Sequence, residues 1–186
     1  MSTTTVSIIV AVAAFAILML IYMMKKQRTH KLRDKFGSEY DRTVGETGGN
    51  ARKAEGILGE RQKRVSKLNI RPLNPEECAR FTTEWRTVQD GFVDDPKTAV
   101  WRADALVNRA LQTCGFPMAD FQEQAANVSV EHPQVVENYR TAHEIAIRDQ
   151  SRQATTEELR RAMQHYRSLF EHVLDTKVMR PEAVHQ

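Results

Sequence analysis

The sequence predicts an all-α protein with a single N-terminal transmembrane helix, a helical stalk or hairpin, and then a compact helical bundle. Two observations favour this class. Apolar residues recur every three or four positions over most of the chain, which is the period of a helix. No stretch shows the sustained alternation with β-branched residues that is typical of strands. The chain divides into an N-terminal tail (1–5), an apolar segment (6–24), a basic segment (25–68), a bundle domain (69–175) and a loose C-terminal tail (176–186).

The apolar segment predicts a membrane anchor. Residues 6–24 contain no charge and no proline, and at roughly 1.5 Å per residue such a helix covers a hydrocarbon core of about 30 Å. A cleaved signal peptide would carry positive charge before the apolar run, whereas here the positive charges follow it. Because Lys and Arg stay on the cytoplasmic side, we expect a single-pass plasma-membrane protein with its N-terminus outside and its C-terminal domain in the cytoplasm.

Charge is distributed unevenly along the chain. The formal net charge of +3 combines a basic segment after the anchor with an acidic remainder. Basic residues beside a membrane are attracted to anionic lipid headgroups by about 1 kcal/mol each. No aromatic residues alternate with the basic ones and no nucleic-acid-binding module is recognisable, so we expect no nucleic acid partner. The residues expected at the membrane surface are Lys25, Lys26, Arg28, Lys31, Arg33 and Lys35.

The basic segment has the pattern of two helices with thin apolar faces. Leu32, Phe36, Tyr40 and Val44 recur at i+4 within an expected helix over residues 28–47. Two glycines at 48–49 end this pattern, and a second helical stretch follows between residues 54 and 68. Because the apolar faces are thin, these helices should pack on the following domain or on a partner chain, which leaves a homo-oligomer open.

The bundle domain begins with the proline-rich linker 69–75. Asn74, Pro75 and Glu77 form a capping-box pattern, which predicts a helix with an aromatic stripe as far as Phe92. Further helices are predicted to begin at Pro96 with Asp95 as the cap, near Met118, at Pro133, and after Thr155, which forms a capping box with Glu158. The stripe of the first helix consists of Cys78, Phe81, Trp85, Val88 and Phe92, and we interpret it as core.

Four stretches of the chain read RDKFGSEYDRTV, LNIRPLNPEECARFTTEWRTVQDGFVDDP, NVSVEHPQVVENYRTAHEIA and TEELRRAMQHYRSLFEHVL. Together they resemble a family of bacterial membrane-anchored helical proteins with no assigned activity. The resemblance covers about Leu32 to Leu174, and its most specific block is Asp94-Asp95-Pro96 with the helix before it. It implies a protein anchored in the bacterial cytoplasmic membrane or envelope and supplies no catalytic residue.

The sequence contains no motif that identifies a particular enzymatic reaction. The phosphate-binding loop, the zinc-protease HExxH, the nucleophile elbow and the dinucleotide-binding glycines are all missing from it. The catalytic candidates are Tyr139, His143 and His165, which would meet if two successive helices pack antiparallel. The alternative is that the tyrosine and His143 fill the edge of the core with satisfied hydrogen bonds. Cys78 and Cys114 lack metal-ligand spacing, so we expect no metal and no cofactor.

A second candidate surface lies around Trp101 with Asp94 and Asp95. A tryptophan off the apolar face of its helix would anchor a partner protein. The alternative is that Trp101 folds onto the neighbouring cap. Three functions remain open: a tethered module for protein binding or scaffolding, an enzyme or ligand-binding domain that uses Tyr139, His143 and His165, and a self-associating structural protein of the envelope.

Overall fold

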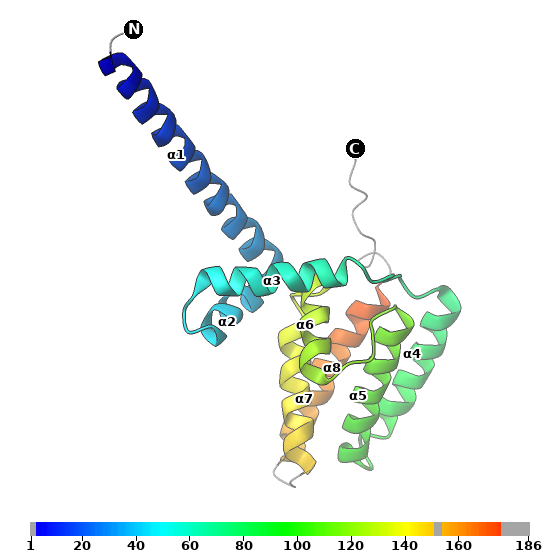
Figure 1. The fold of residues 1–186 in the computed structure, drawn as a ribbon. Helices are drawn as coiled ribbons and strands as arrows, with labels where there is room; N and C mark the ends of the chain where they lie inside the picture. The colour runs from blue at the N-terminus through cyan, green and yellow to red at the C-terminus, as the bar shows by residue number, and fades with distance from the viewer. Residues whose placement is uncertain (1–2, 151–153, 176–186) are drawn as a thin grey trace. The chain divides into compact units, whose positions relative to one another are not determined.

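The computed structural model describes residues 3–150 and 154–175, except for the side chains of residues 3–11, 14, 25 and 150. Across this part of the chain the backbone forms eight helices and no strand, which confirms the all-α class (Figure 1). The helices group into two compact units, of which the first ends at Leu58 and the second begins at Gly59. This division lies within one helix, ten residues before the boundary expected from the sequence.

The first unit contains α1 (Thr3–Phe36), α2 (Ser38–Glu46) and the first half of α3 (Ala51–Val65). The helix expected over 28–47 is interrupted at Gly37, whose φ of 51° is left-handed and is favoured by glycine alone. Its N–H still bonds to the Arg33 carbonyl, and its own carbonyl accepts from the Tyr40 N–H, so one helix ends and the next begins there. Tyr40 and Thr29 both donate hydrogen bonds to the Glu55 carboxylate on α3, at 3.3 and 2.6 Å.

The apolar part of α1 has an uncovered surface. Ten large apolar side chains in it are between 45% and 69% exposed. In the stretches whose side chains are described, no helix is both long and apolar enough to span a membrane. The anchor expected at 6–24 falls partly on residues 6–11 and 14, whose side chains lie outside these stretches. The exposed side chains are Val12, Phe15, Ile17, Leu18, Met19, Leu20, Ile21, Tyr22, Met23 and Met24.

The second unit opens with the linker and α4 (Pro75–Asp90), and the predicted capping box is confirmed. The Asn74 side chain accepts from the Glu77 N–H, and the Glu77 carboxylate accepts from the Asn74 N–H, both at 2.8 Å. Arg71 holds the same carboxylate through two hydrogen bonds of 2.7 and 2.8 Å. A bidentate guanidinium therefore fixes the cap to the linker.

The next helix is α5 (Pro96–Thr113), which begins at the predicted Asp95 cap and ends before Gly115. Gly115 has a φ of +100°, and a Cβ on it would lie 2.4 Å from the carbonyl oxygen of Asn69. The linker backbone passes this closely because the Arg71 N–H donates to the Cys114 carbonyl at 2.8 Å. Only glycine fits this approach.

The last three helices are α6 (Phe121–Glu131), α7 (Val136–Gln150) and α8 (Thr156–Leu174). The helix α6 starts later than residue 118 because the Asp120 carboxylate caps it by accepting from the Glu123 N–H at 2.9 Å. The predicted start of a helix at Pro133 is wrong, since residues 133–135 form a turn and α7 begins at Val136. The capping box of Thr155 and Glu158 is confirmed.

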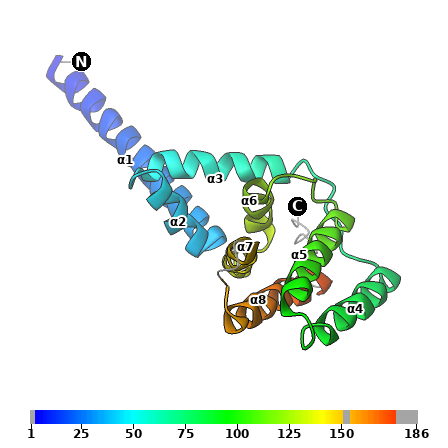
Figure 2. The ribbon, with the colours of Figure 1, turned by 90° about the horizontal axis from the view of Figure 1, so that it is seen from below.

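The core of the second unit lies where α8 packs against both α5 and α7, and α4 packs against α5 (Figure 2). The stripe predicted on α4 does face this core, with Phe81, Trp85 and Val88 buried and Cys78 and Phe92 partly buried. Aromatic and aliphatic side chains of α5, α7 and α8 complete this core. Among the largest fully buried ones are Leu106, Leu111, Tyr139, Tyr166 and Leu169.

Candidate functional site

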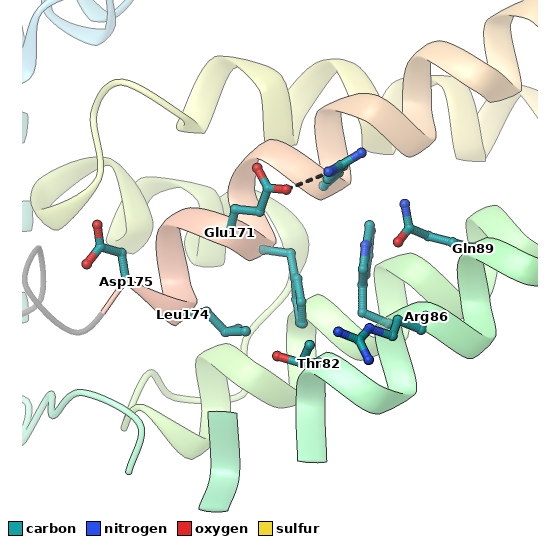
Figure 3. A pocket seen from close by; sticks show the side chains of 9 residues that line it. Thr82, Arg86, Gln89, Glu171, Leu174 and Asp175 are labelled. Atoms are coloured by element: carbon teal, nitrogen blue, oxygen red, sulfur yellow. Dashed lines mark hydrogen bonds and ion pairs between the residues drawn. The ribbon is translucent and has the colours of Figure 1, made fainter. Parts of the chain in front are cut away.

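A groove of about 410 Å³ lies between α4 and α8, two helices that both pack against α5 (Figure 3). Its floor is aromatic, because the rings of Trp85 and Phe170 stack with their centroids 4.6 Å apart and their planes 15° from parallel. Both rings are almost wholly buried, at 5% and 3% exposed. Leu174 continues this apolar floor towards the end of α8. The groove thus presents a firm apolar surface below a polar rim.

The rim of the groove carries charged and amide side chains from both helices (Figure 3). On α8, Arg167 and Glu171 neutralise each other through an ion pair of 2.7 Å. On α4, Arg86 is exposed, and no carboxylate of the described residues pairs with it. Gln89 lies one turn further along the same wall, so the α4 side offers a cation and an amide.

A second polar site is centred on Asp104 of α5. The Tyr166 hydroxyl donates to its Oδ1 at 2.8 Å, and the Asn108 side chain donates to its Oδ2 at 3.1 Å. The Oδ1 of Asn108 in turn accepts from the Tyr139 hydroxyl at 2.8 Å and from the Gln124 amide at 2.9 Å. Four helices therefore contribute to one hydrogen-bonded network inside the bundle.

His143 lies at the edge of this network. Its Nδ1 is 3.6 Å from Oδ1 of Asp104, which is an electrostatic contact and too long for a hydrogen bond. Its ring stacks on Phe121 with centroids 3.6 Å apart and planes 8° from parallel. The side chains of His143 and Asp104 are 22% and 15% exposed. His143 and Asp104 therefore form a partly exposed pair whose imidazole is positioned by its stacking on Phe121, since its Nδ1 has no hydrogen-bond partner among the described residues.

The two tyrosines of the network act as hydrogen-bond donors and not as acids. Burial raises the pKa of Tyr139 far above its ordinary value, and the charge of Asp104 raises it further. The pKa of Tyr166 is raised for the same two reasons, and by its own hydrogen bond to Asp104. Both hydroxyls keep their protons at any physiological pH, so Tyr166 continues to donate to the Asp104 carboxylate and Tyr139 to the Asn108 side chain.

The structure brings together two of the three catalytic candidates. The rings of Tyr139 and His143 both contact Phe121. The Tyr139 hydroxyl bonds to Asn108, while His143 lies beside Asp104. His165 is half-buried on α8, and no described interaction joins it to His143. The next residue, Tyr166, faces the network instead. Sequence reasoning missed Asp104 because an acid among the apolar residues of a helix has no spacing signal of its own.

The three residues of the candidate surface around Trp101 differ in their exposure and in their contacts. Trp101 is half-buried and Asp94 is exposed. The carboxylate of Asp95 caps α5 by accepting from the Thr98 N–H at 3.1 Å. Hydrogen bonds from Thr98 lower the pKa of Asp95, which fits a carboxylate that works locally in the fold.

The two cysteines are free thiols. Cys114 is fully buried, and burial raises its pKa to about 12, whereas Cys78 is half-buried. Over the described residues, no three His, Cys, Asp or Glu side chains gather closely enough to hold a metal ion.

The expected lipid-facing residues lie on α1. Lys26, Arg28, Lys31, Arg33 and Lys35 are all exposed, and the side chain of Lys25 lies outside the described residues. A hollow of about 340 Å³ on this helix is lined by Met23, Lys26, Gln27, His30, Lys31 and Asp34. It marks the point where the apolar part of the helix gives way to the basic part.

Comparison with protein-family models, with curated proteins and with solved structures found no match. The fold and its sites define an all-helical bundle with an open aromatic groove and a buried polar network.

Proposed function

We propose that the chain is a membrane-anchored protein-binding module, in which α1 lies in the bilayer and the groove between α4 and α8 takes up a segment of a partner protein. The groove is the observation that supports binding most directly. Its stacked floor of Trp85 and Phe170 is held by the core, so it keeps its shape without a partner. Grooves between two helices with an apolar floor commonly receive an amphipathic helix or peptide.

The charges on the rim indicate the chemistry of the partner segment. Glu171 is neutralised by Arg167, whereas Arg86 has no carboxylate among the described residues. A segment that places an apolar side chain on the aromatic floor and a carboxylate beside Arg86 complements both features. Partner binding thus requires an acidic amphipathic segment.

The anchor is supported by the surface of α1. Its large side chains from Val12 to Met24 are exposed on all sides of the helix, and large uncovered apolar surfaces mark membrane or protein contacts. The run that contains them is 19 residues long in sequence, at 6–24, and basic residues follow it directly. The positive charges favour a cytoplasmic bundle at the plasma membrane, with the basic residues among anionic headgroups.

Protease protection tests the orientation. An epitope after Gln186 should resist protease added to cells whose outer barrier has been permeabilised, and should be cleaved once the plasma membrane is lysed. Cleavage before lysis would place the bundle outside.

Site-specific photocrosslinking in intact cells tests the groove. We expect a photoreactive residue in place of Gln89 to capture one discrete protein through a segment that contains a carboxylate and large apolar residues. The matched control is Gln164, an exposed glutamine on α8 outside the groove. Capture at Gln89 should disappear with Arg86→Glu and persist with Arg161→Glu, an exposed arginine of α8 outside the groove.

Two outcomes would overturn the groove as a partner site. One is identical capture from positions 89 and 164. The other is a crosslink between two copies of this chain, which would favour the self-associating structural protein.

The second candidate function is an enzyme that uses the Asp104–His143 pair. It is favoured by the 3.6 Å contact between Oδ1 of Asp104 and Nδ1 of His143, and by the partial exposure of both side chains. His143→Phe keeps a ring against Phe121 and removes the imidazole. If His143 transfers protons, this variant fails to complement a strain that lacks the chain while its melting temperature is unchanged. Full complementation would remove the enzyme from consideration.

A further inference from the structure

Two histidines that the proposed function does not use face each other inside the bundle. His132 ends α6 and His172 lies in the last turn of α8, and their rings meet edge to face with centroids 4.8 Å apart. His132 is only 1% exposed. Neither of its ring nitrogens, nor Nε2 of His172, has a hydrogen-bond partner among the described residues. Such buried polar atoms are rare in folded proteins and are costly for the fold.

The surroundings of the pair offer little to a positive charge. The ring of Phe116, in the segment after α5, lies 6.4 Å from that of His132 and is apolar. From α8, the titratable group that acts on His132 is His172, which is itself a base. The carboxylate of Asp175, just after α8, acts on His172 and favours its charged form, but burial outweighs this effect. A positive charge on His132 is thus disfavoured first by burial and then by the nearness of His172.

We propose that the His132–His172 pair is an acid-sensitive latch, in which proton binding to these rings releases the end of α8 from α6. The inference goes beyond the proposed partner and does not depend on it. Burial, followed by the nearness of His172, lowers the pKa of His132 to about 4, and burial also lowers the pKa of His172. Protonation therefore favours an open form in which the rings reach water.

The sign and size of the effect follow from these values. In the open form His132 has its ordinary pKa of 6.5, whereas in the closed form its pKa is about 4. The closed form keeps its population well above pH 6.5, and below this pH its population relative to the open form falls by up to tenfold for each pH unit. The fall levels off below pH 4 at about 300-fold. Opening should therefore become more frequent as the pH falls from 6.5 towards 4.

The position of the latch links it to the groove. Phe170, Glu171 and Leu174 line the groove from the same two turns of α8 that carry His172, and Asp175, just after α8, lines it as well. Opening of these turns would move one wall of the groove and remove Phe170 from Trp85. Acid would thus weaken the proposed partner site as a consequence of the latch.

The test uses the full chain in phospholipid nanodiscs, with no partner added. The NMR signals of the His132 ring should titrate below pH 5, and amide hydrogen exchange at residues 170–174, corrected for intrinsic rates, should accelerate over the same range. His132→Phe should remove this acceleration, because a buried phenyl ring gains no charge. His165→Phe, which changes a half-buried histidine on the same helix, should keep it.

Two results would overturn the latch. One is titration of His132 near pH 6.5 with no change in exchange at the end of α8. The other is an acid response of His132→Phe identical to that of the unaltered chain. If this variant does not fold, the ring titration of the unaltered chain decides alone. Failure of the crosslinking at Gln89 leaves all of these readouts intact, so it is distinguishable from failure of the latch.

Discussion

The hydroxyl of Tyr166 donates a hydrogen bond of 2.8 Å to Oδ1 of Asp104, which joins α8 to α5 across 62 residues of sequence. Asp104 is thereby held inside an otherwise apolar bundle. The same oxygen is the one nearest to His143. This single bond therefore supports both the packing of the two helices and the candidate Asp–His pair.

Loss of the Tyr166 hydroxyl should destabilise the bundle. Tyr166→Phe removes a donor from a mostly buried carboxylate, which costs about 1–3 kcal/mol in the free energy of unfolding. Tyr139→Phe should cost less, because its acceptor, Oδ1 of Asn108, keeps the hydrogen bond from Gln124. Urea denaturation of the two variants measures the difference. Equal costs, or no cost for Tyr166→Phe, would show that Asp104 does not depend on this donor.

The close approach at Gly115 should tolerate no side chain. Gly115→Ala would place a Cβ 2.4 Å from the Asn69 carbonyl oxygen on a backbone with φ of +100°, so we expect a loss of about 2–3 kcal/mol.

The control for this position is Gly56→Ala. Gly56 lies within α3 and has open space around it, so alanine should gain about 0.5–1 kcal/mol through its higher helix propensity. Thermal unfolding of Gly115→Ala and Gly56→Ala measures both changes in stability. A neutral Gly115→Ala would contradict the path of the linker next to the end of α5.

The capping box at the start of α4 should be visible in the titration of Glu77. Hydrogen bonds from Arg71, and then from the backbone of Asn74, lower the pKa of Glu77 to about 2. The stabilisation from this carboxylate is therefore complete above its ordinary pKa of 4.5 and is lost as the pH falls from 4.5 towards 2. Arg71→Met should raise the pKa of Glu77, as followed by carboxyl NMR. An unchanged pKa would show that the ion pair does not form in solution.

The cap itself should contribute a measurable free energy. Asn74→Ala removes the acceptor for the Glu77 N–H and should cost about 1 kcal/mol in unfolding. Thr155→Ala, at the matching box of α8, should cost a similar amount. Chemical denaturation of each variant is the measurement. An unchanged free energy of unfolding in both variants would contradict the two capping boxes.

The two thiols should differ in reactivity. Cys78 is half-buried, whereas Cys114 is fully buried with a pKa raised to about 12, so few Cys114 thiolates form at neutral pH. A disulfide-exchange reagent should label one thiol per folded chain quickly and the second only on unfolding. Cys78→Ala should abolish the fast phase. Fast labelling of both thiols would mean that the end of α5 opens readily.

The helices were predictable where local chemistry decides their ends. Asn74 with Glu77, Asp95 before Pro96, and Thr155 with Glu158 all cap the helices that their patterns indicate. Prediction failed at Pro133, because the first helical position is suited to proline but does not require a helix there. It also failed at Gly37, where a single left-handed residue divides one periodic stretch into two helices.

The candidate site was less predictable, because it depends on which helices become neighbours. The spacing of Tyr139 and His143 places them on one face of α7, but nothing in the sequence brings Asp104 opposite them. The groove likewise needs α4 and α8 to lie against the same helix. Trp85 was identified only as core, and its second role as the floor of a groove follows from the stacking of Phe170.

The apolar part of α1 is proposed to hold the bundle and its groove at a membrane. Alkaline extraction of membranes from cells that make the full chain tests this anchor, with a chain that lacks residues 6–24 as the control. The full chain should stay with the membrane pellet at pH 11, while the shortened chain should be released into the supernatant. Release of the full chain as well would contradict the anchor and would indicate that another protein covers the exposed apolar surface of α1.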